Sequence, residues 1–310
     1  NYTKYSLGET YMLDFRFDTF LTLCKVKNYT ETAKLLHLTQ PAVSQHIKYL
    51  EKTYNCKLFS YKGKSLSLTP KGEILKSFAM SLKASSDKIK STLAMEDDIY
   101  HLKFGSTLTI SEYTMKPIIS QVLLDNPTID LTMEVNNTKI LLEKLKDGKL
   151  DFVVLEGTFD KLDYESRILS LERFIPICSP NNKLANKAIE FTDILNERLI
   201  TREYGSGTRN ILEHILCDHN LSITSFRNLT KIGSINIIKN LVQNNFGITF
   251  LYEQAVYEEI KQGTLCEVSI NNYNVSREFN FVFLKDSLHK EEYLKWFDYF
   301  YRIKKSPRRL

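Results

Sequence analysis

Residues 28–51 read NYTETAKLLHLTQPAVSQHIKYLE, and this stretch decides the fold of the N-terminal part of the chain. Two short helical patterns lie on either side of His37-Leu38, which makes a tight turn between them. Thr30 is placed to cap the first helix and Thr39 the second, because a threonine hydroxyl accepts a hydrogen bond from the amides of a first helical turn. The stretch therefore predicts a helix–turn–helix.

The second of these helices runs from about residue 40 to residue 54 and has two distinct faces. Val43, Ile47 and Leu50 recur on one side and predict its buried face. The other face is polar near the N-terminus, where a helix lying in the major groove of DNA presents its base-reading side chains. Those polar residues are Thr39, Gln40, Ser44, Gln45 and Lys48.

The residues on both sides strengthen the DNA-binding interpretation. Residues 14–27 predict a preceding helix, and residues 58–68 predict a small hairpin, or wing, that carries Lys62 and Lys64. Between residues 48 and 71 there are six lysines and one glutamate, a local charge of +5. A helical hairpin with a solvated polar face is the commoner meaning of such a pattern, but the basic wing favours phosphate contact.

The motifs over residues 17–72 resemble the winged helix–turn–helix of LysR-type transcriptional regulators. They are F-x-x-F from Phe17, A-x-x-L-x-x-T-Q-P-A-V-S within the quoted stretch, L-F at residues 58–59 and L-T-P-K-G at residues 68–72. The chain departs from the family at Tyr54-Asn55, where Leu-Gly is usual, and at Tyr61 and Lys64, where arginines are common. A lysine keeps the charge but loses the bidentate fork of arginine, so less directional wing contacts are expected.

The resemblance implies a sequence-specific transcriptional regulator that binds double-stranded promoter DNA, with RNA polymerase as a further partner. The implied DNA-binding domain spans residues 12–72, whereas residues 1–11 precede Met12 and do not enter the fold prediction. The residues expected to contact DNA are Thr30, Thr39, Gln40, Pro41, Ala42, Ser44, Gln45, Lys48, Lys62 and Lys64.

A long helix is predicted from about residue 73 to residue 95, within a linker that spans residues 73–98. Its apolar residues form an incomplete stripe, and a helix of this length needs a packing partner. The partner is either the same chain or a second copy. The resemblance favours the second copy, since paired DNA half-sites call for a symmetric homodimer, or a homotetramer built from it.

After Tyr100 the pattern changes to short apolar strands that alternate with amphipathic helices. Such alternation predicts an α/β fold with a mostly parallel sheet. By resemblance this is a two-lobed α/β effector domain of the periplasmic-binding-protein type. Its first lobe is expected at residues 99–168 and 277–310, and its second lobe at residues 169–276.

Glycine- and hydroxyl-rich loops follow three of the predicted strands, at the ends where α/β sheets bind ligands. The loop at residues 203–209 reads EYGSGTR and precedes a helix, so its amides and Arg209 suit an anionic group. By resemblance these loops face a cleft that holds a small, anionic effector. Glu156, after another strand, is expected to be solvated rather than to meet an amino group. The predicted effector residues are Ser106, Thr107, Gly205, Ser206, Gly207, Thr208, Arg209, Ser234 and Asn236.

The sequence contains no motif for catalysis, for a metal or for a cofactor. It also contains no run of 18 apolar residues, so no membrane span is predicted. The five scattered cysteines indicate reduced thiols and a cytoplasmic protein. Cys178 and Cys217 as redox switches, as in peroxide-sensing members of the family, are a less favoured alternative to inert thiols. Two other function classes remain open, a small-molecule-binding protein without a DNA role and an α/β enzyme.

The charge is unevenly distributed along the chain, in agreement with a DNA-binding part followed by an effector domain. The 310 residues include 42 Lys and Arg and 37 Asp and Glu, for a net charge of +5. Residues 1–95 carry a net charge of +8, residues 96–301 carry −8, and residues 302–310 carry +5. A basic N-terminal third on an acidic body predicts that the first part meets a polyanion. The basic C-terminal tail has no assigned role.

Overall fold

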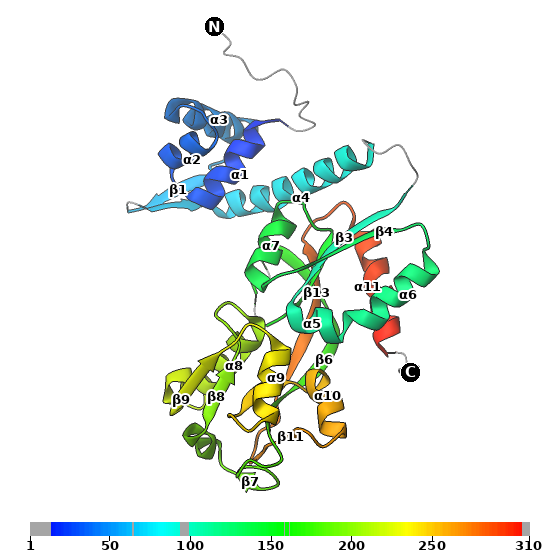
Figure 1. Cartoon of the computed structure of the whole chain (residues 1–310). Coiled ribbons are helices and arrows are strands. Elements are labelled where there is room, and N and C mark those ends of the chain that lie inside the picture. The colour runs from blue at the N-terminus through cyan, green and yellow to red at the C-terminus, as the bar shows by residue number, and fades with distance from the viewer. Residues whose placement is uncertain (1–13, 64, 94–98, 158, 161, 306–310) are drawn as a thin grey trace. The chain divides into compact units, whose positions relative to one another are not determined.

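The computed structural model describes residues 14–63, 65–93, 99–157, 159–160 and 162–305, and the structural statements below concern these residues. The chain divides into two compact units (Figure 1). The first unit is Asn1–Asp98 with the short pieces Lys146–Lys149 and Leu284–Lys290. The second unit comprises Ile99–Leu145, Leu150–Phe283 and Glu291–Leu310. Residues 1–11 and the end of the predicted linker, residues 94–98, lie outside the described residues.

The first unit is a winged helix–turn–helix followed by a long helix, as predicted. The strands β1 and β2 pair antiparallel with Phe59 opposite Leu68, which confirms the wing. The elements, in chain order, are α1 (Arg16–Val26), α2 (Tyr29–Leu35), α3 (Gln40–Thr53), β1 (Phe59–Lys62), β2 (Ser65–Leu68) and α4 (Pro70–Leu93).

One of the two predicted helix caps is wrong. The Thr39 hydroxyl accepts a hydrogen bond from the Ala42 amide over 3.3 Å and caps α3 as expected. Helix α2, however, begins before Thr30 and is capped by Asn28, whose side-chain oxygen accepts from the Glu31 amide at 3.0 Å. Asn28 has the extended backbone that a cap requires, whereas Thr30 already lies inside the helix.

The core of the first unit joins all its helices to the wing. Phe20, Leu23 and Leu58 are fully buried, and Ile47 and Leu50 from α3 pack with them. Gly72, in the first turn of α4, lies directly against the backbone of Leu58, the residue before β1. A Cβ atom there would stand 2.2 Å from the Leu58 carbonyl oxygen, so the glycine is required by a close backbone approach.

The second unit is organised around a sheet with the strand order β4-β3-β5-β13-β6-β10, and β11 also pairs with β6. Strands β3, β4 and β5 are parallel, but β13 runs antiparallel to β5, and β10 and β11 run antiparallel to β6. The sheet is therefore mixed rather than mostly parallel. The bounds are β3 (His101–Ser106), β4 (Asp130–Val135), β5 (Phe152–Glu156), β6 (Tyr164–Cys178), β10 (Thr249–Tyr252), β11 (Cys266–Glu267) and β13 (Ser276–Leu284).

A smaller parallel pair, β8 (Arg198–Thr201) with β9 (Asn228–Lys231), lies beyond the β10 end of the sheet and is joined to it by the Leu199–Ile248 bridge. Strands β7 (Ala188–Ile189) and β12 (Ser269–Ile270) also pair in parallel. The helices of the unit are α5 (Leu108–Tyr113), α6 (Met115–Asp125), α7 (Thr138–Lys146), η1 (Phe191–Asn196), α8 (Gly207–Asp218), η2 (Ile223–Ser225), α9 (Ile235–Gln243), α10 (Glu253–Lys261) and α11 (Lys290–Lys305).

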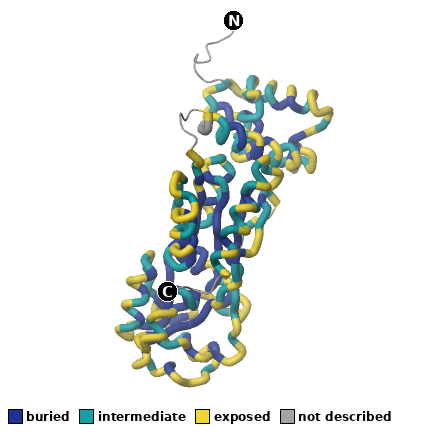
Figure 2. The backbone as a smooth tube through the Cα atoms, turned by 90° about the vertical axis from the view of Figure 1, so that its right-hand side faces the viewer, coloured by how far each residue is buried: buried dark blue, intermediate teal, exposed yellow. Residues whose placement is uncertain are grey.

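The buried residues of this unit gather on its central strands, which are dark blue in Figure 2. Phe152 stacks on Phe104 at 5.2 Å and on Phe281 at 4.2 Å between ring centroids, and Phe300 of α11 packs edge-on against all three. Such aromatic packing makes a rigid core that holds β3, β5 and β13 together with α11.

Candidate functional site

Helix α3 presents two chemically different faces, as its sequence predicts. Val43, Ile47 and Leu50 are between 0 and 2% exposed and fix the helix on the core. Gln45 and Lys48 are exposed on the opposite face, Gln45 in the N-terminal half of the helix and Lys48 just past its middle. A polar N-terminal face on a helix held rigidly from behind is the arrangement that reads base edges in a major groove.

Most of the predicted DNA-contacting residues are exposed in the part of the chain that the structure describes. The exposed ones are Thr30, Thr39, Gln40, Pro41, Gln45 and Lys48, whereas Ala42 and Ser44 are partly buried. Lys62 lies in β1 of the wing, and Lys64 lies outside the described residues.

His46, on the partly buried side of α3, contacts α1 and the residue before it. Its Nδ1 lies 2.9 Å from the Thr19 hydroxyl, and Phe15 packs edge-on against the ring at 5.1 Å. Burial, and then the nearby Arg16 charge, lower the pKa of His46. The imidazole therefore joins α1 to α3 as a packing residue.

Glu51 ties the end of α3 to the wing. One carboxylate oxygen accepts from the Leu58 amide at 3.0 Å, and the other pairs with Lys57 at 2.7 Å. Thr69 makes a second connection, since its hydroxyl donates to the Lys57 carbonyl at 2.6 Å. These contacts set the position of the wing relative to the helix.

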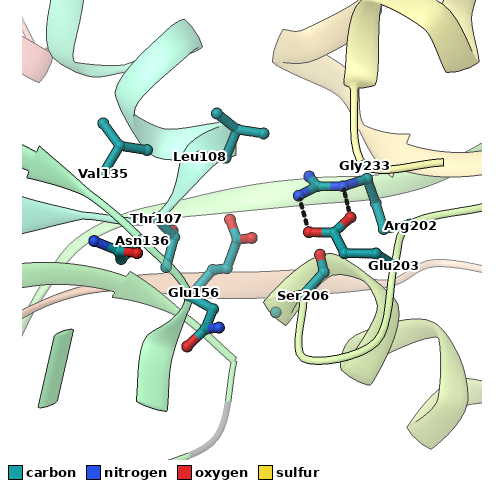
Figure 3. A pocket seen from close by; sticks show the side chains of 11 residues that line it. Thr107, Leu108, Val135, Asn136, Glu156, Arg202, Glu203, Ser206 and Gly233 are labelled. Carbon is teal, nitrogen blue, oxygen red and sulfur yellow. Dashed lines mark hydrogen bonds and ion pairs between the residues drawn. The ribbon is translucent and has the colours of Figure 1, made fainter. Parts of the chain in front are cut away.

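The second unit contains a cavity of about 290 Å³ (Figure 3). Its walls come from the carboxyl ends of β3, β4 and β5 on one side and from the loops after β8 and β9 on the other. Its volume suits a small metabolite. The lining residues are Thr107, Leu108, Val135, Asn136, Asn137, Glu156, Arg202, Glu203, Ser206, Gly207 and Gly233.

Arg202 and Glu203 form a bidentate ion pair in the cavity wall, drawn as dashed lines in Figure 3. The Arg202 Nε and Nη2 atoms donate to the two Glu203 carboxylate oxygens at 2.7 and 2.8 Å. Burial acts to raise the pKa of Glu203, but the hydrogen bonds from Arg202 outweigh it and lower the pKa. The guanidinium is thus held at the cavity with part of its charge compensated.

Glu156, at the end of β5, is buried with 2% exposure, which overturns the expectation of a solvated side chain. Its Oε1 accepts from the Thr208 hydroxyl at 3.0 Å and from the Thr109 hydroxyl at 3.4 Å. Burial raises the pKa of Glu156 to about 7, although the hydrogen bond from Thr208 and the Arg202 charge act to lower it.

The cavity includes some of the residues predicted for the effector and leaves others outside its lining. Thr107, Ser206 and Gly207 line it, and Thr208 lies behind the wall as a partner of Glu156. The Arg209 Nε atom pairs with Glu213 at 2.8 Å, and its guanidinium carbon is 5.7 Å from the Tyr204 ring centroid. The predicted residues absent from the lining are Ser106, Gly205, Thr208, Arg209, Ser234 and Asn236.

Several lining residues were not predicted. Asn136 and Asn137 directly follow β4, and Arg202 and Glu203 directly follow β8. These residues carry neither glycine nor hydroxyl groups, so selecting glycine- and hydroxyl-rich loops does not find them. Their signal is a polar side chain directly after a strand, where α/β sheets bind ligands.

Two family comparisons match nearly the whole chain. Residues 16–73 match the family described as bacterial regulatory helix-turn-helix protein, lysR family, and residues 97–302 match the LysR substrate binding domain. The chain belongs to the LysR family.

This LysR-family chain is similar to proteins named as transcriptional regulators. It is 28% identical to the HTH-type transcriptional regulator CysL of Bacillus subtilis, over 85% of this chain and 88% of CysL. It is 26% identical to the HTH-type transcriptional activator CmpR of Synechocystis, over 87% of this chain and 88% of CmpR.

Solved structures show the same fold. A hydrogen peroxide-bound mutant of OxyR from Corynebacterium glutamicum superposes with a TM-score of 0.60 at 22% identity, covering 95% of this chain and 94% of that chain. The Synechocystis CcmR regulatory domain, in complex with 2-PG, superposes with a TM-score of 0.58 at 19% identity, covering 66% and 98%.

The LysR-family chain is therefore a DNA-binding transcriptional regulator whose activity a small effector modulates. Within the described ranges, no three His, Cys, Asp or Glu side chains gather in a way that would hold a metal ion. None of the helices that the structure describes is both long and apolar enough to cross a membrane.

Proposed function

We propose that this regulator binds double-stranded promoter DNA in the cytoplasm as a homo-oligomer, and that a small anionic effector in the cavity controls it. The observation that carries the proposal is the composition of the cavity wall. Thr107 and Glu156 come from the expected first lobe, residues 99–168 and 277–310, and Arg202 and Ser206 come from the expected second lobe, residues 169–276. A ligand that contacts both walls stabilises one arrangement of the lobes over another, which is what a population shift requires.

The oligomer is proposed from the surface of α4. Ile74, Phe78 and Leu82 are 61, 50 and 37% exposed and stand four residues apart, so they lie along one side of the helix. Exposed apolar side chains in such a row favour pairing with an identical helix. A homodimer built on α4, or a tetramer of two such dimers, would pair the α3 helices on two DNA half-sites.

The anionic group of the effector is assigned to the hydroxyls of Thr107 and Ser206 and to the Arg202 guanidinium. Arg209 remains a second candidate, because its partner Glu213 is 38% exposed on the helix surface and competes weakly with an incoming anion. A thermal-shift titration with small carboxylates separates the two. Loss of the shift in Arg202→Gln but not in Arg209→Ala would assign the anion to Arg202, and the reverse would assign it to Arg209.

The regulatory role is tested on DNA from upstream of the chain's own coding region. Fluorescence anisotropy is expected to show binding. The logarithm of the binding constant should fall linearly with the logarithm of the salt concentration between about 50 and 200 mM. An unrelated duplex of equal length serves as the control. Absence of binding at the low-salt end would contradict the proposal and favour a binding protein without a DNA role.

The proposal includes contact with RNA polymerase and excludes enzymatic turnover. The fold places hydroxyls at the cavity, but no activated nucleophile is among the described residues that line it. A detectable turnover that Ser206→Ala abolishes would instead favour an α/β enzyme. Co-purification of the DNA-bound regulator with RNA polymerase holoenzyme tests the partner.

A further inference from the structure

Glu156 is held in the cavity wall by the element packed on it. Gly207 begins α8, and a Cβ atom there would stand 2.8 Å from the Glu156 Cγ and 3.3 Å from its carbonyl oxygen. The absence of a side chain at Gly207 thus lets the helix approach β5 closely. The Glu156 carboxyl group is left with little freedom to turn away from the cavity.

The two oxygens of this carboxyl group have different surroundings. Oε1 accepts from the hydroxyls of Thr208 and Thr109, whereas Oε2 is buried and has no hydrogen-bond partner among the described residues. A buried carboxylate oxygen without a donor is costly, so native structures rarely keep one unless a ligand or a water completes it.

The protein offers this group little counter-charge. Among the described residues that line the cavity, Arg202 carries the positive charge. Its Nε and Nη2 atoms already donate hydrogen bonds to Glu203. The wall therefore carries two carboxyl groups and one guanidinium. Burial without a paired cation is the reason why the pKa of Glu156 is raised to about 7.

We infer that the effector carries a protonated amine in addition to its anionic group, and that this amine donates to the free Oε2 of Glu156. The effector class is then an amino acid or a similar small zwitterion, with its anion toward Ser206 and Arg202. This inference rests on the proposed function, in which the cavity is the effector site. The cavity of about 290 Å³ accommodates a molecule of that size.

An ammonium group fits the site better than a hydroxyl for a physical reason. A hydroxyl supplies one donor and no charge, whereas an ammonium supplies three donors and the missing counter-charge. A charge-assisted hydrogen bond in a buried site strengthens binding by about 10- to 100-fold relative to a ligand that lacks the donor.

The test uses the full-length chain and matched sets of acids. Each proteinogenic L-amino acid is compared with the 2-hydroxy acid and the plain carboxylic acid of the same carbon skeleton. Thermal shift ranks the compounds, and calorimetry measures Kd for those that bind. At least one amino acid is expected to bind about 10- to 100-fold more tightly than its hydroxy and plain counterparts.

Glu156→Gln supplies the residue-level test, because glutamine keeps the shape and removes the charge. The preference for the amine is expected to vanish in this variant and to survive in Glu213→Gln, an acidic residue of α8 that does not line the cavity. A preference that survives Glu156→Gln would overturn the assignment. Should that variant fail to fold, the wild-type ranking decides alone.

The outcomes separate this inference from the proposed function. Plain acids that bind as tightly as their amino counterparts would overturn the amine assignment and leave the anionic effector site standing. Binding by none of the acids would overturn both, and binding by amines without a carboxylate would overturn the anionic effector while it supports the role of Glu156.

Discussion

The Thr208 hydroxyl donates a hydrogen bond to the Glu156 carboxylate over 3.0 Å, and this contact joins the end of β5 to the first turn of α8. Residues 52 positions apart in the chain thus meet at the wall of the cavity. The contact couples the protonation state of Glu156 to the packing of the helix.

The stability of the chain is predicted to depend on the protonation of Glu156. Its pKa is about 7 in the folded protein and 4.5 as a reference value, so between these pH values the native state keeps a proton that the unfolded chain has lost. The free energy of unfolding therefore decreases as the pH rises from 4.5 to 7, by on the order of 3 kcal/mol from this residue.

Urea unfolding of the wild type and of Glu156→Gln across this range measures the effect. The other titrating groups are shared, so the difference between the two curves isolates Glu156. The variant is expected to gain stability relative to the wild type as the pH rises. Parallel curves would contradict the raised pKa.

Gly207→Ala is predicted to destabilise the second unit by about 1–3 kcal/mol, because the new Cβ meets the Glu156 side chain at 2.8 Å and its backbone at 3.3 Å. Gly233→Ala is the matched control on the same cavity. The nearest atom to a Cβ at Gly233 is 3.7 Å away, so the melting temperature is expected to stay within experimental error. Equal losses in the two variants would refute the packing argument.

Helix α3 and the wing are predicted to differ in role, with α3 reading the base sequence and the wing binding phosphate. Gln45→Ala is expected to relax discrimination at one base pair by about 1–3 kcal/mol, since glutamine bonds the edge of adenine. Lys62→Ala, in the wing, is expected to weaken binding to all sequences alike and to reduce the salt slope by about 1. Lys116→Ala, an exposed lysine on α6, serves as the control in the anisotropy titration. A sequence-dependent loss in Lys62→Ala would contradict the phosphate role of the wing.

Phe78→Glu is predicted to separate the proposed dimer, because the charge would be buried between two copies of α4. Sedimentation at micromolar concentration is expected to show a shift toward monomer. Lys71→Ser, an exposed polar change on the same helix, should leave the distribution unchanged. A dimer that persists in Phe78→Glu would place the interface elsewhere.

The first unit follows closely from its sequence because its signals are local. The spacing of Val43, Ile47 and Leu50 and the cap at Thr39 depend on residues within one helix, and the structure confirms both. The cap of α2 was misplaced because Asn28 and Thr30 are both good cap residues. The backbone is extended at Asn28 and helical from Tyr29 onward, so Asn28 rather than Thr30 is the cap.

The site in the second unit was less predictable because it depends on contacts between distant strands. Glu156 looks solvated in a local window, and it becomes buried because Gly207 admits α8 against β5.

Strand β6 leads the chain out of the expected first lobe, and β13, its neighbour in the sheet, leads it back. If the lobes have the expected bounds, the two covalent connections of the second lobe are adjacent strands of the sheet rather than separate loops. Rotation of one lobe against the other would twist the hydrogen-bonded pair of strands β6 and β13, and this pairing opposes large rotations. We therefore expect a bound effector to shift the balance between lobe arrangements that differ only by a small angle.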